Sequence, residues 1–217
     1  MPVFPIAIMG EYGLVNIYVM ISGGVMAIAR SERSLTYRVD DLPGGSSSRL
    51  KEMILYISNK CKTNETYGKT KLNKILYFSD FKSFHRRGVP ITGTTYQKLA
   101  HGPAPVAMCP VQEELTSMGH LVCKPTPYQN KMQHRLIALR KPDLSIFSRA
   151  DLDIVDEVIK ELWNLNADDT SKKSHGIAYR LCDEGVRIPY EASFLAEPHS
   201  KAKISNRARD LGDKYGW

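Results

Sequence analysis

After residue 48, apolar residues recur every three or four positions along much of the chain, which indicates amphipathic helices. Ser48 can cap the first helix, whose apolar residues fall on one face: Leu50, Met53, Ile54, Ile57 and Cys61. Thr70 can cap a second helix that runs to about Arg87 and ends at Gly88. The patterning therefore predicts two consecutive helices before the chain becomes extended.

The second helix has two neighbouring stripes of mainly apolar or aromatic residues, which predicts packing over more than half of its circumference. The remaining side is predicted to face solvent and carries Lys71, Lys74, Phe78, Lys82 and His85. Asp80 lies in an aromatic stripe with Tyr77, so its carboxylate needs a donor or must stay protonated. Two interpretations follow for Asp80: a buried group that holds a neighbouring loop through backbone N–H groups, or a catalytic acid.

Residues 89–93 predict a turn, residues 95–99 a short strand, and His101-Gly102-Pro103 a second turn. Gly102 allows an unusual backbone angle, and Pro103 can be the first residue of a helix over residues 104–118 that ends at Gly119. Pro110 implies a kink in that helix or a later start. His101 is either a turn histidine that bonds the backbone or a switch or base.

Residues 121–124 and 135–139 predict a hairpin whose long polar tip spans residues 125–134. Ser148 and Asp151 form a capping box before an amphipathic helix that ends at Trp163. A short helix then starts near Asn166 and reaches Ser174 and His175. Together these elements predict a mainly α fold with a small antiparallel β-sheet, that is, a compact helical α+β domain.

Three segments are expected: an N-terminal extension and linker (residues 1–48), one domain (49–197) and a basic tail (198–217). Residues 12–29 form an uncharged run of 18 residues, the lower limit for a membrane span. The favoured interpretation is an extension outside the domain, either a strand or the product of an upstream start with Met26 as the true first residue. A membrane anchor and a secretory signal follow in that order.

Thirty Lys and Arg against 23 Asp and Glu give a net charge of +7, which permits an acidic partner, either nucleic acid or protein. The four cysteines include no C-x-x-C pair, so free thiols in a reducing cytoplasm are expected. The six histidines lack metal-ligand spacing, and phosphate-binding and hydrolase motifs are missing from the sequence. We therefore expect no metal, no cofactor and no catalytic residues.

The run KLNKILYFSDFKSFHRRGVPITGTTYQKLAHGP at residues 71–103, with the later Trp163, Leu165, Asn166, Ser174 and His175, resembles the Panacea domain of SocA-like antitoxins. Phage-associated GepA-type proteins share this domain. The resemblance covers about residues 49–195. Phe78 stands where the family often has a second tyrosine. The residues that carry the pattern are expected to hold the fold: Tyr77, Asp80, Tyr96, His101, Gly102, Pro103, Trp163, Ser174 and His175.

The resemblance implies an antitoxin that neutralises a cognate toxin encoded nearby, by direct protein binding or as an adaptor that delivers the toxin to a protease; a chaperone is a further possible partner. Candidate residues for the toxin interface are Lys74, Phe78, Lys82, His85 and Tyr128. Two alternatives remain open: a nucleic-acid-binding regulator, and an enzyme built on Asp80, His101 and His175 if the fold brings these residues together. A membrane partner is not expected.

Overall fold

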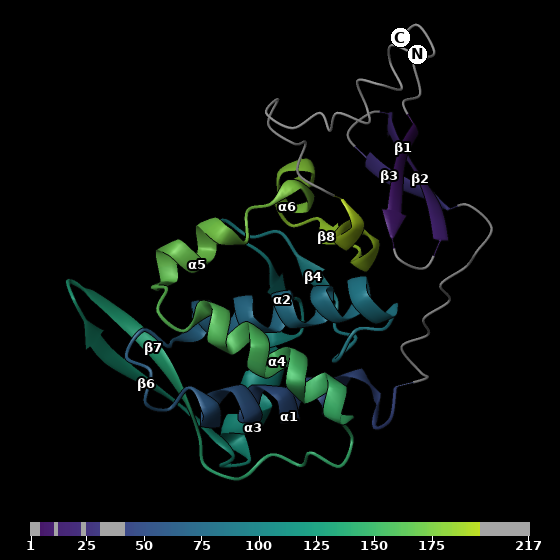
Figure 1. The fold of residues 1–217 in the computed structure, drawn as a ribbon. Coiled ribbons are helices and arrows are strands. Elements are labelled where there is room, and N and C mark those ends of the chain that lie inside the picture. The colour runs from purple at the N-terminus through teal and green to yellow at the C-terminus, as the bar shows by residue number, and fades with distance from the viewer. Residues whose placement is uncertain (1–4, 11–12, 23–24, 31–41, 196–217) are drawn as a thin grey trace, which may run out of the picture.

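The computed structural model describes residues 5–10, 13–22, 25–30 and 42–195, with side chains described from residue 42. Three helices dominate: α1 (Gly45–Lys60), α2 (Lys69–Arg87) and α4 (Arg149–Leu162). Figure 1 shows α2 crossing the domain behind α4, and α2 contacts α1, α4, α5 (Ala167–Lys173) and the 3-10 helix η2 (Tyr190–Phe194). Eleven of the 19 residues of α2 are buried, so this helix is the centre of the packed core.

Two small antiparallel sheets accompany the helices. In the first, β4 (Tyr96–Gln97) lies between β5 (Ala104–Pro105) and β8 (Arg187–Ile188). The second is the hairpin of β6 (Leu121–Tyr128) and β7 (Lys131–Ala138), in which Leu121 pairs with Ala138 and Tyr128 with Lys131. The shorter helices are α3 (Met108–Ser117) and α6 (Ile177–Leu181). The predicted α+β class, mainly helical with small antiparallel sheets, is confirmed.

The N-terminal region contains an antiparallel sheet of β1 (Pro5–Gly10), β2 (Gly13–Ser22) and β3 (Val25–Arg30), in the order β1-β2-β3. Most of the uncharged run at residues 12–29 is therefore strand. Among the described residues, no helix combines the length and the apolar character needed to cross a bilayer. The predicted linker falls largely outside the described residues, and the predicted tail (198–217) lies entirely outside them; the domain boundaries stay predictions.

Several helix ends differ from the sequence-based expectation. Ser48 does not cap α1, because the chain turns at Gly44 (φ 80°) and the helix has already begun at Gly45. Likewise, α2 begins at Lys69 with Gly68 before it, so Thr70 lies inside its first turn. The predicted stop at Gly88 is confirmed: its φ is 73°, and its N–H donates to the carbonyl of Phe84.

Two further boundaries are corrected, and the start of α4 is confirmed. Helix α3 begins at Met108, so Pro110 lies in the first turn, where a missing N–H costs no helical bond, and Ala104–Pro105 is strand β5. The hairpin strands continue into the predicted polar tip and leave only residues 129–130 as the turn. The capping box of α4 is confirmed, since the Ser148 side chain accepts from the N–H of Asp151 and the Asp151 side chain accepts from the N–H of Ser148.

Candidate functional site: polar contacts around helix α2

Asp80 is fully buried in α2 and holds the loop that follows the helix. Its Oδ1 accepts the backbone N–H groups of Ile91 (2.8 Å) and Thr92 (2.7 Å). Its Oδ2 accepts the hydroxyls of Thr92 (2.5 Å) and Tyr96 (2.8 Å). Burial raises the pKa of Asp80, and the hydrogen bonds from Thr92, Tyr96 and Ile91 oppose that rise. These are the contacts expected of a carboxylate that fixes a loop.

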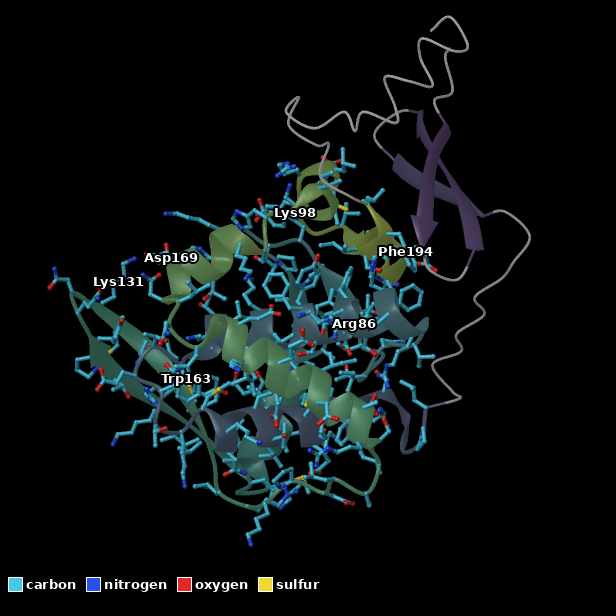
Figure 2. All side chains as sticks on the ribbon, in the orientation of Figure 1. Arg86, Lys98, Lys131, Trp163, Asp169 and Phe194 are labelled. Atoms are coloured by element: carbon cyan, nitrogen blue, oxygen red, sulfur yellow. The ribbon has the colours of Figure 1, made fainter. Side chains whose placement is uncertain are left out.

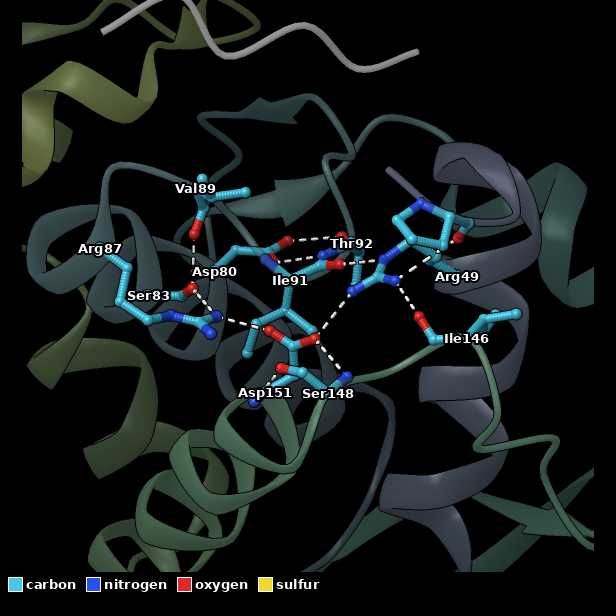
Figure 3. A network of polar contacts seen from close by, with 11 residues as sticks. Arg49, Asp80, Ser83, Arg87, Val89, Ile91, Thr92, Ile146, Ser148 and Asp151 are labelled. Atoms are coloured by element: carbon cyan, nitrogen blue, oxygen red, sulfur yellow. Dashed lines mark hydrogen bonds and ion pairs between the residues drawn. The ribbon is translucent and has the colours of Figure 1, made fainter. Parts of the chain in front are cut away.

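A second buried network adjoins the first through the carbonyl of Ile91 (Figure 3), which accepts from Nε of Arg49 at 2.5 Å. Another nitrogen of Arg49 donates to Oδ2 of Asp151 at 3.1 Å, and Arg87 donates to Oδ1 of Asp151 at 2.5 Å. Arg49 is only 2% exposed. Helices α1, α2 and α4 are thus joined by one carboxylate and two guanidinium groups.

The His101-Gly102-Pro103 turn is held against α2 by a buried lysine. Nζ of Lys74 donates to the carbonyl of Pro103 at 2.8 Å, and Lys74 is 1% exposed. Burial lowers the pKa of this ammonium group to about 7. The prediction that Lys74 faces solvent is therefore wrong, because β5 and the turn before it pack on this side of α2.

Helix α5 holds the other side of the same turn. The Ser171 hydroxyl donates to the carbonyl of His101 at 2.6 Å, and the Ser174 hydroxyl donates to the carbonyl of Ser171 at 2.6 Å. The side chain of His101 itself is exposed. The ring of His175 stacks on Tyr179, with 4.1 Å between ring centroids. Burial, together with the positive charges of two nearby lysines, lowers the pKa of His175.

Lys71 makes a similar buried contact at the end of α4. Its Nζ donates to the carbonyls of Trp163 (2.9 Å) and Leu165 (2.8 Å), and burial lowers its pKa to about 8. Lys71 is 1% exposed, so its predicted place on a solvent-facing side is also wrong. The contribution of Trp163 to this contact is its backbone carbonyl, which also accepts from Asn64 at 2.8 Å.

Aromatic rings fill the space between α2, β4 and η2. Tyr77 contacts Phe81 (centroids 4.3 Å apart) and Tyr96 (5.6 Å), and Phe81 contacts Tyr190 (5.1 Å). Burial raises the pKa of both Tyr77 and Tyr96. Phe78 is partly buried and packs against this core, with its ring 5.4 Å from that of Tyr77.

The predicted interface residues differ in their surroundings. Lys82 is paired with α4, since its Nζ lies 2.5 Å from Glu161 and 3.3 Å from Glu157. Arg86, labelled in Figure 2, donates two bonds to the same Glu157 (2.6 and 2.9 Å). The exposed His85 contacts the carbonyl of Ser193 through Nδ1 at 3.0 Å, and Tyr128 lies at the far end of β6. The basic side of α2 is therefore partly buried and partly neutralised.

The elements that carry these contacts coincide with a known family pattern. Residues 72–178 match the family model described as the antitoxin SocA-like Panacea domain. This region of the chain is a Panacea domain. The residues matched by the family model are fewer than those over which the sequence resembles the family, about 49–195. Searches of curated proteins and of solved structures gave no significant match.

Within the Panacea domain, Asp80 belongs to a different set of contacts from His101 and His175, the other residues of the possible active site. The side-chain partners of Asp80 are Thr92, Tyr96 and Tyr190, so neither histidine bonds its carboxylate. In the part of the chain that the structure describes, no three His, Cys, Asp or Glu side chains are placed to hold a metal ion.

Sequence reasoning missed four residues that organise the fold: Arg49, Asp151, Ser171 and Tyr190. Asp151 was assigned only to the capping box, although its carboxylate also accepts from two arginines. A charged residue among the apolar positions of α1 could have singled out Arg49, since a buried guanidinium needs an acidic partner. Ser171 and Tyr190 act through backbone carbonyls of distant segments, and a sequence pattern gives no signal for such contacts.

Proposed function

We propose that this protein is a cytoplasmic antitoxin that neutralises a cognate toxin, encoded nearby, by direct protein binding. The observation that carries the proposal is the Panacea domain at residues 72–178, whose family is described as SocA-like antitoxins. A stable complex would bury about 1,200–2,000 Å² of surface in total.

The contacts of the motif residues support a binding role over catalysis. Asp80 and Lys74 direct their polar atoms at the protein's own loops, and the Ser174 hydroxyl donates to a carbonyl of the helix that it ends. An enzyme usually keeps such groups in a cleft, where they can reach a substrate. The family motif thus stabilises the domain, and we assign partner recognition to the surface of the domain.

Co-expression tests the proposal. The product of the gene next to the one for this protein is expressed in a growing host, alone and together with the full chain. We expect growth arrest in the first case and restored growth in the second. A neighbouring product that is harmless alone, or whose toxicity this protein leaves unchanged, would contradict the proposal.

Measuring the half-life of the neighbouring gene's product in cells distinguishes direct binding from delivery to a protease. Neutralisation by binding leaves its half-life unchanged or longer and yields a complex on co-purification. A half-life that becomes shorter when this protein is present, and recovers in a protease-deficient host, would instead indicate an adaptor.

A further inference from the structure

A surface groove lies where α1, α4 and the loop after β7 meet. It consists of two adjoining hollows of about 500 and 400 Å³, both lined by Lys60. Ile159 and Trp163 of α4 line the first hollow, and Leu144 lines the second. Trp163, at the C-terminal end of α4 (Figure 2), and Leu144 are partly buried and pack against the core, so the groove has an apolar floor.

The rim of this groove is basic. Three lysines (Lys60, Lys141 and Lys160) and one carboxylate (Asp156) line it. The carboxylate is already satisfied, since Oδ1 of Asp156 accepts the Tyr56 hydroxyl at 2.7 Å and Oδ2 accepts Nζ of Lys60 at 2.9 Å. Lys141 and Lys160 are exposed. Within the described part of the chain, neither of them lies in any of the ion pairs formed.

This arrangement contrasts with the neighbouring face between α2 and α4. There Lys82 and Arg86 are paired with Glu157 and Glu161, so the positive charge is compensated inside the protein. The groove keeps two uncompensated positive charges beside an apolar floor. Charges that find no partner within a domain attract an acidic partner, and apolar hollows receive the side chains that anchor an interface.

We propose that the groove binds an acidic amphipathic segment of the protein partner, with apolar side chains in the two hollows and carboxylates beside Lys141 and Lys160. Identification of that partner as the toxin rests on the proposed function. Protein is favoured over nucleic acid because no arginine, the side chain best suited to bidentate phosphate contacts, lines the hollows. Trp163 is also packed against the core, whereas base stacking requires an open ring face.

The first test reverses the charge of the groove. The variant Lys141→Glu/Lys160→Glu is compared with Lys124→Glu/Lys173→Glu, which changes the net charge equally. Lys124 and Lys173 are also exposed, and neither forms an ion pair with another described residue. In co-expression with the neighbouring gene's product, we expect the control pair to restore growth and the groove pair to fail. With purified proteins, the association rate should fall roughly tenfold or more for the groove pair, and its salt dependence should weaken.

A second test uses tryptophan emission and does not depend on the toxin. Trp163 and Trp217 are the two tryptophans, so Trp217→Phe leaves Trp163 as the reporter of the groove. This protein is titrated with a synthetic helical peptide of Glu and Leu, with the same peptide carrying Lys for Glu, and with a DNA duplex. We expect a saturable change with the acidic peptide only, lost on adding Lys141→Glu/Lys160→Glu.

The outcomes distinguish the groove from the proposed function. If the wild type and both variants neutralise the toxin equally well, the proposal that the groove binds the partner is wrong, and the proposed antitoxin function is unaffected. If the wild type does not neutralise the toxin, the proposed antitoxin function is wrong, and the peptide titration alone tests whether the groove binds an acidic segment. If the tryptophan emission does not change with the acidic peptide, or changes with DNA alone, the proposed binding role of the groove is wrong. Equal melting temperatures of the wild type and the variants would show that a loss of binding is not caused by unfolding. If the Lys→Glu variant is unstable, Lys141→Ala/Lys160→Ala removes the same charges with a smaller change.

Discussion

Lys71 and Lys74 are buried lysines whose partners are neutral. Each ammonium group donates to backbone carbonyls, at Trp163 and Leu165 for Lys71 and at Pro103 for Lys74. A carbonyl does not compensate a full charge, so burial lowers the pKa values of both groups. Each lysine thus fixes a loop to α2 at the cost of an uncompensated buried charge.

The buried charge of Lys74 predicts how stability depends on pH. The pKa of Lys74 is about 7 in the folded protein and 10.5 for an unperturbed lysine. Between these values the unfolded chain binds more protons, so the free energy of unfolding rises with pH, by at most about 1.4 kcal/mol per pH unit for this group. Lys74→Met removes the contribution. Denaturant unfolding between pH 7 and 9 should give a steeper rise for the wild type, and parallel profiles would contradict the assignment.

Gly102 shows that the turn against α2 requires glycine for two reasons. Its φ is +92°, and a Cβ atom there would lie 2.4 Å from Oγ of Ser174 and 2.8 Å from Cε of Lys74. Gly102→Ala therefore combines backbone strain of about 1–2 kcal/mol with overpacking of about 1–3 kcal/mol. Denaturant unfolding should show a loss of more than roughly 2 kcal/mol.

Gly185 provides the matched control for Gly102. Its φ is +78°, yet no atom of the described residues lies within 4 Å of a Cβ atom built there. Gly185→Ala should show the backbone strain alone, so its loss of stability should be the smaller of the two. Equal losses would mean that the contact with Ser174 and Lys74 does not limit the turn.

At the scale of elements, the start of α4 combines a helix cap with a link between helices. Ser148 and Asp151 form the capping box, and the carboxylate of Asp151 also accepts from Arg49 and Arg87. Burial alone would raise the pKa of Asp151, but the Arg87 guanidinium and the hydrogen bonds from Ser148 lower it below its usual value. One residue therefore fixes both the beginning of α4 and its position against α1 and α2.

Substitutions at the start of α4 should separate these two contributions. Ser148→Ala removes a cap bond and should cost about 1 kcal/mol. Asp151→Asn leaves the buried Arg49 without its charged partner and should cost about 3–5 kcal/mol. Asp153→Asn is the control, because it removes only an exposed pair with Arg149 and should cost under about 1 kcal/mol. Thermal or denaturant unfolding measures all three, and similar losses for Ser148→Ala and Asp151→Asn would contradict the link to α1 and α2.

At the scale of the whole molecule, the sequence predicted the features that depend on local signals. The stop of α2 at Gly88 follows from the freedom of glycine at positive φ, and the start of α4 follows from the spacing of Ser148 and Asp151. The α+β class follows from the order of helical and extended segments. Each of these depends on residues that lie close together along the chain.

The contacts of α2 could not be predicted in the same way. A helical wheel shows which side of α2 is basic, but not that the turn before β5 and the end of α4 cover it. The carbonyls that accept from Lys71 and Lys74 lie 92 and 29 residues away, respectively, and a backbone carbonyl gives no residue-specific signal in a sequence. For the same reason, the groove beside Lys160 was not predicted, since its walls come from α1, α4 and the loop after β7.

The most direct test of the central claim uses the purified protein and the purified product of the neighbouring gene. The toxin's activity is measured while this protein is added, without protease or nucleic acid, and the mixture is then analysed by size-exclusion chromatography. Neutralisation by direct binding predicts that activity falls to background at a fixed molar ratio and that both chains elute as one complex of the same composition. Full toxin activity in the presence of excess protein, or loss of activity without a complex, would contradict the account.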